Sequence, residues 1–140
     1  MKKLILLLLL FSALAFSAFK AWPHILRHSM FLSGEISLSP DFAKSARKPN
    51  LMLFIVALNN KGVPVAVKKI IDPSFPVSFS ISKKELLLPE LLTGEFYIEA
   101  ILNPHGQLGV FRKGDMKSAR SGPFLFIEKD IKIVLTEKAG

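Results

Sequence analysis

The chain has 140 residues, half of them hydrophobic, and a formal net charge of +8 at pH 7. It contains no cysteine, which excludes disulfides, thiolate nucleophiles, cysteine-ligated metals and a lipid-modified N-terminal cysteine. This length supports one compact domain but not two. The stability of that domain must therefore come from the burial of apolar side chains.

The N-terminal segment has the three parts of a secretory signal. Lys2 and Lys3 give a positive start, and residues 4–11 form an apolar run without a polar side chain. Small residues follow in the cleavage-like sequences Ala13-Leu14-Ala15 and Ala15-Phe16-Ser17. We therefore expect residues 1–20 to be a signal peptide that exports the protein to the periplasm or cell envelope.

The same segment can also be interpreted as an uncleaved membrane anchor. The apolar character continues to Trp22, so residues 4–22 come close to the roughly 20 residues that a bilayer requires. Retention would tether the protein to the inner membrane, with Trp22 suited to the interface. Residues 21–32 are expected to be a linker with a short amphipathic lead, and residues 33–136 to be the folded domain.

The positive charge is spread along the chain. Without Lys2 and Lys3 the net charge falls from +8 to +6. Arginine does not alternate with aromatic residues in the way that favours base stacking, so nucleic acid is not an expected partner. A solvated basic face is favoured over a specific anionic partner. The dispersed basic residues are Lys44, Arg47, Lys48, Lys68, Lys69, Lys83, Lys84, Arg112, Lys113, Lys117 and Arg120.

The first half of the mature chain has the periodicity of short strands. Ile36 and Leu38 alternate with polar residues, which predicts a half-buried strand. The continuous apolar run 51–58 predicts a central strand covered on both faces. A turn at 59–62 then leads into a strand over 63–67, whose proline lies near its beginning.

The second half continues this pattern. In the segment 77–82, Val77, Phe79 and Ile81 alternate with serines, as in a strand with one solvated face. Ser82 and Glu85 predict a capping box and a single helical turn ending at Pro89. We expect a strand over 95–102 with four apolar residues on one face, followed by a turn over 103–106 with an exposed His105. A short segment at 108–111 precedes an irregular loop over 114–123. Two closing strands are expected over 124–127 and 131–135.

This organisation predicts an all-β fold, an antiparallel β-sandwich of about seven or eight short strands preceded by an N-terminal apolar signal or anchor helix. No helical crossovers separate the strands, which argues against a parallel α/β fold. A closed barrel is the second interpretation.

The sequence contains few groups suited to chemistry. His24 and His28 are four residues apart with Met30 nearby, a spacing that could hold copper or zinc on a helix. Without a carboxylate or thiolate beside them, this is an incomplete ligand set, so no metal or cofactor is expected. No Gly-x-Ser-x-Gly elbow, paired carboxylates or phosphate-binding glycine loop occurs, and no catalytic residue is assigned. We do not expect an enzyme.

Several strand and turn motifs occur in a particular order. They are residues 33–40, 53–57, 63–69, 75–81, 99–101, Gly106, 114–115 and 121–123. In this order they resemble the C-terminal periplasmic domain of the cytochrome c-type biogenesis protein that chaperones apocytochrome c. The resemblance covers residues 33–127. Its motifs are turns and core positions, and it contains no signature of its own.

The resemblance implies a periplasmic β-sandwich that acts without catalysis in cytochrome c maturation. Its expected partners are proteins of the cytochrome c assembly machinery or apocytochrome c. The family also carries a tetratricopeptide-repeat region that grips the apocytochrome and further membrane helices, neither of which occurs here, so a docking role is expected. Two other functions stay open: a small periplasmic metal-handling protein using His24, His28 and Met30, and a structural module of the envelope.

Overall fold

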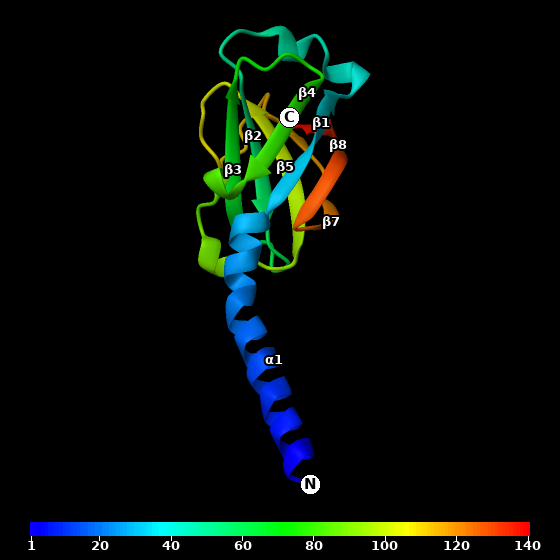
Figure 1. Cartoon of the computed structure of the whole chain (residues 1–140). Helices are drawn as coiled ribbons and strands as arrows, with labels where there is room; N and C mark the ends of the chain where they lie inside the picture. Colours follow the sequence, from blue (N-terminus) through cyan, green and yellow to red (C-terminus); the bar gives the residue numbers. More distant parts are fainter.

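The computed structural model describes all residues, 1–140, and confirms the predicted fold class. One N-terminal helix precedes eight strands and four short 3-10 turns, η1 to η4 (Figure 1). The helix is α1 (Lys2–Ser29). The strands are β1 (Phe31–Leu38), β2 (Met52–Leu58), β3 (Pro64–Ile71), β4 (Val77–Ser82), β5 (Glu95–Asn103), β6 (Met116–Ser118), β7 (Ser121–Leu125) and β8 (Ile127–Lys138). The turns are η1 (Pro40–Phe42), η2 (Ser45–Arg47), η3 (Lys83–Glu85) and η4 (Pro89–Leu91).

Helix α1 projects from one end of the β domain (Figure 1). Its leucine- and alanine-rich sequence favours a helix, and Arg27 and His28 in the last turn interact favourably with the helix dipole. The helix is long and apolar enough to cross a membrane, and its most apolar 18-residue window is fully exposed. No irregular linker follows, because α1 ends at Ser29 and β1 begins at Phe31. The range 21–32, expected to be a linker, therefore belongs to the end of α1 and the beginning of β1.

The strands form a single mixed sheet and not two separate ones. Its strand order is β3-β2-β5-β6-β8-β1-β4, and β7 pairs additionally with β5. All neighbours are antiparallel except β1 and β8, which are parallel. This parallel pair departs from the expected antiparallel arrangement. In this pair, the last strand of the chain lies beside the first strand and runs in the same direction.

The sheet curls until its two edge strands, β3 and β4, nearly meet. The segment after β4 bridges the remaining gap: Ala66 of β3 forms an isolated bridge with Leu86, and the Leu87 N–H donates to the Val65 carbonyl at 2.8 Å. Lys68 also reaches across, because its Nζ donates to the Ser80 carbonyl at 2.9 Å. The domain is thus a nearly closed barrel, so the second interpretation of the strand pattern describes its shape.

An apolar core of 20 buried residues fills this barrel, and a second cluster consists of Phe54, Val56 and Leu58 of β2. In β2, which lies between β3 and β5, six of the seven residues are buried, as predicted for a central strand. The predicted alternation in β4 is also confirmed, since Val77, Phe79 and Ile81 are buried and Ser78 is exposed. The four predicted inward residues of β5 are buried as well, namely Phe96, Ile98, Ala100 and Leu102. Ser82 and Glu85 form the predicted capping box at η3.

The strand register divides the barrel into two ends. At the end that carries α1, which we call the proximal end, Phe31 pairs with Ser82 on one side and with Ile127 on the other. At the opposite, distal end, Met52 pairs with both Ile71 and Asn103. The distal end also contains η1, η2 and the end of β8 (Figure 1).

Candidate functional site

Four segments come together at the distal end: residues 39–51 after β1, 72–76 after β3, 104–115 between β5 and β6, and 139–140 after β8. Two open clefts lie between them. One, of about 570 Å³, is lined by Ala43, residues 46–49 and residues 72–75, together with Leu38 and Leu51. The second is lined by Lys48, Lys113, Lys138 and the C-terminal residues. Lys48 belongs to both clefts, so the distal end presents one continuous surface.

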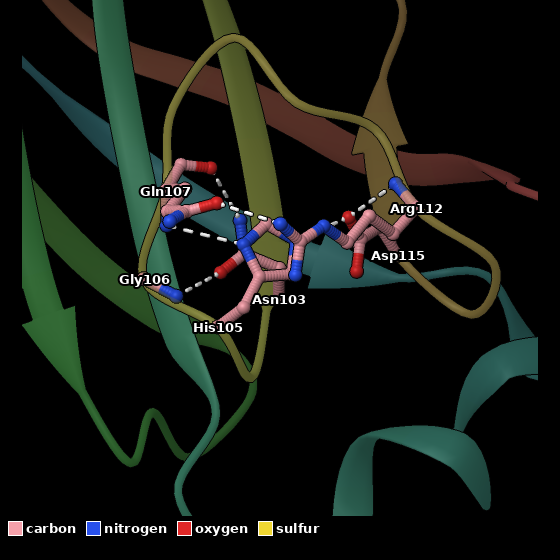
Figure 2. Close-up of polar contacts among 6 residues, drawn as sticks. All are labelled: Asn103, His105, Gly106, Gln107, Arg112 and Asp115. Carbon is pink, nitrogen blue, oxygen red and sulfur yellow. Dashed lines mark hydrogen bonds and ion pairs between the residues drawn. The ribbon is translucent and has the colours of Figure 1, made fainter.

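A buried polar network holds the loop between β5 and β6, residues 104–115 (Figure 2). Asp115 is 1% exposed, and its Oδ2 lies 2.7 Å from His105 Nε2 and accepts from the Arg112 N–H at 2.7 Å. Asn103 is fully buried at the end of β5, where its Oδ1 accepts from the Gly106 N–H and its Nδ2 donates to the Gln107 carbonyl. The two buried side chains thus fix both ends of the loop.

The hydrogen bonds of His105 determine its tautomer. The Gln107 N–H donates to Nδ1 at 3.2 Å, so this nitrogen accepts and the proton lies on Nε2, from which it is donated to Asp115. Both ring nitrogens are therefore occupied within the loop (Figure 2). In this arrangement the imidazole has no free nitrogen to act as a general base, and its role in the loop is structural.

His105 is less accessible than its turn sequence predicts. A histidine between a proline and a glycine is expected to be exposed, yet its side chain is only 14% exposed and pairs with buried Asp115. The pairing joins residues ten positions apart in the chain, at the two ends of the loop. In the sequence, the only indication of this pairing is that one residue is a histidine and the other an aspartate.

The distal surface is strongly basic. Three pairs of opposite charges occur in the protein, namely Lys68–Glu85, Lys117–Glu137 and Arg120–Glu99, and His105 is hydrogen-bonded to Asp115. None of them involves the cations that we call the distal basic surface, which consists of Lys44, Arg47, Lys48, Arg112, Lys113 and Lys138. All of these except Lys138 belong to the dispersed basic residues that the sequence pattern predicts to form a solvated face. The fold gathers them at one end of the barrel.

Few acidic groups oppose this charge. They include Asp41 in η1, Asp72, which lines the first cleft and accepts from the Asn50 N–H at 2.8 Å, and Asp115, which is buried against His105. Lys138 donates to the Ser45 hydroxyl at 3.0 Å, which ties η2 to the end of β8. The basic groups from three distant parts of the chain are thereby held on one frame, and their fields add over the surface.

The tip of the 104–115 loop adds an apolar component. Leu108, Val110 and Phe111 are each about 40% exposed. The Lys117 ammonium lies 4.9 Å from the centre of the Phe111 ring. Exposed apolar side chains beside unpaired cations give a surface suited to protein contacts, in which apolar groups contribute affinity and charges contribute orientation.

The structure separates Met30 from the other two candidate metal ligands of the sequence. His24 and His28 are exposed on α1, and His28 Nδ1 lies 2.9 Å from the His24 carbonyl oxygen. Met30 is 2% exposed and belongs to the domain core, so its thioether is buried while the two imidazoles face solvent. No group of three or more histidine, aspartate or glutamate side chains is placed to hold a metal ion.

Comparisons with protein-family models, with curated proteins and with solved structures find no match for this chain. Its fold and surface therefore define it only as a small β-barrel domain on an apolar N-terminal helix.

Proposed function

We propose that this protein is an exported, membrane-tethered binding module that acts through protein contacts and not through catalysis. Helix α1 is the proposed tether, because it is apolar, exposed and joined directly to β1. Tethering would hold the β domain on the periplasmic or envelope side of the membrane with its distal end directed away from the bilayer.

The observation that carries this proposal is the distal basic surface. Six cations without ion-pair partners lie beside the apolar tip of the 104–115 loop, at the end of the domain farthest from α1. A partner that fits this surface carries acidic side chains interspersed with apolar ones. Electrostatic steering by such a surface would speed the encounter with that partner.

A narrower role in cytochrome c maturation rests on the order of strand motifs alone. In that role the partner would be a protein of the assembly machinery or apocytochrome c. The β domain would act in this role as a docking module. A clean deletion of the gene should then lower the amount of haem-stained cytochromes c, and normal amounts would contradict the narrower role.

The binding function is tested with the full chain in detergent and a labelled peptide that alternates glutamate and leucine. In the variant Arg47→Glu/Lys48→Glu/Lys113→Glu, affinity should fall by about tenfold or more. The matched control Lys61→Glu/Lys83→Glu/Lys84→Glu makes the same change in net charge at the proximal end. Equal losses in both variants would show that only the total charge matters and would contradict a distal site.

A further inference from the structure

Exposed apolar side chains flank the position where α1 joins the β domain. Phe31, the first residue of β1, pairs with the end of β4 on one side and the beginning of β8 on the other. Leu87 and Leu91 follow β4, and Leu125 and Ile127 lie at the β7–β8 junction. We call these four leucine and isoleucine residues the proximal rim, and their exposed fractions are between 41% and 61%.

The proximal rim lies at the level where the helix would leave a bilayer. From Leu4 to Trp22 the helix is about 28 Å long, close to the roughly 30 Å of a hydrocarbon core. Trp22 packs edge-on against Phe126, with ring centroids 6.1 Å apart. Phe126 lies between Leu125 and Ile127, so the domain reaches down to the residue that would mark the membrane interface.

Contacts on both sides of the helix fix this geometry. Leu26 and Met30 are each 2% exposed, α1 touches η3, and the Phe31 N–H donates to the Phe126 carbonyl at 2.9 Å. The domain therefore cannot swing freely around the helix, as it could on a flexible linker. Whenever α1 spans a bilayer, the proximal rim is held at the lipid surface.

We propose that the proximal rim is a lipid-contacting surface, which rests on the membrane tethering proposed above. Its occupant is the phospholipid bilayer that holds α1. The apolar rim continues the apolar surface of the helix, and interfacial burial of such side chains is favourable. Lys83 and Lys84 suit lipid phosphates, but Glu90 and Glu95 lie nearby in the chain, so apolar contact dominates and the contact should depend little on salt.

The test moves the only tryptophan of the chain. In a Trp22→Phe background, Leu87→Trp and Ile127→Trp each report on the proximal rim, and Ile71→Trp, at a 64% exposed position of the distal end, is the matched control. The full chain is placed in lipid nanodiscs that contain phospholipids brominated near the top of the acyl chains. Quenching of the rim tryptophans should be several-fold stronger than quenching of the control tryptophan.

The possible results distinguish failure of the rim from failure of the tether. Strong quenching of Trp22 in the unchanged protein, with the rim tryptophans quenched no more than the distal control, supports the tether but overturns the lipid-contacting rim. A rim covered by a second copy or by another protein would give that result. Absence of quenching at Trp22 itself, or a chain that stays outside the nanodiscs, overturns the tether and the rim together.

Discussion

Gly34 of β1 lies directly against the backbone of Ile131 in β8, so that a Cβ at position 34 would overlap the Ile131 carbonyl oxygen. The register of the parallel β1–β8 pair shifts between Leu32 and Gly34, and Asp130 beside it has a φ of 58°. The glycine thus permits the close approach of the first and last strands. The pair joins β1 and β4 to the rest of the sheet.

The substitution Gly34→Ala should therefore destabilise the protein. The added methyl group forces β1 and β8 apart, an overpacking that costs about 1–3 kcal/mol. The free energy of unfolding from chemical denaturation measures the loss. Ser33→Ala, one position earlier in the same strand, is the control and should change stability by less than half as much. Equal stability of Gly34→Ala and the parent would show that the pair tolerates a side chain there.

A second prediction concerns the buried carboxylate of Asp115. Asp115→Ala leaves the Arg112 N–H and the His105 Nε2–H without their acceptor, and an unsatisfied buried donor costs about 1–3 kcal/mol. Amide hydrogen exchange across residues 104–114 should become faster. Asp72→Ala is the control, because Asp72 is exposed and accepts only from Asn50. Unchanged exchange in the loop would contradict the role given to Asp115.

A third prediction concerns the contacts that bridge the gap between β3 and β4. Lys68 is 30% exposed and lies 3.9 Å from Glu85, so Lys68→Met should cost less than about 1 kcal/mol of stability. By contrast, Leu87→Pro removes the N–H that donates to Val65 and should cost more. Thermal unfolding of the two variants ranks them. The reverse order would mean that the lysine, and not the main chain, holds the barrel closed.

Local patterns carried most of the fold prediction. The alternation in β4 and β5 and the capping box of Ser82 and Glu85 involve residues close in sequence, where periodicity and turn chemistry decide the structure. Contacts between distant segments left no such signal. The pairing of β1 with β8, and the short strand β6 in a region expected to be an irregular loop, depend on how the sheet closes.

The candidate site was less predictable for the same reason. The cations of the distal basic surface come from the loop after β1, the β5–β6 loop and the end of β8, and in the sequence they are dispersed lysines and arginines. The register that places Met116 opposite Lys138 and the hydrogen bond from Lys138 to Ser45 show that they share one end. Met30, in contrast, is close in sequence to His24 and His28 but is separated from them by burial, since it belongs to the core.

The last prediction concerns the junction of α1 with the β domain. Trp22→Ala removes the edge-on contact with Phe126, and such aromatic pairs contribute about 0.5–1.5 kcal/mol beyond their area. The end of α1 should then separate more readily from the barrel, and the amides of residues 24–30 should exchange faster in detergent. Phe19→Ala is the control, because Phe19 is 79% exposed. If both variants exchange like the parent, Leu26 and Met30 alone hold the helix against the domain.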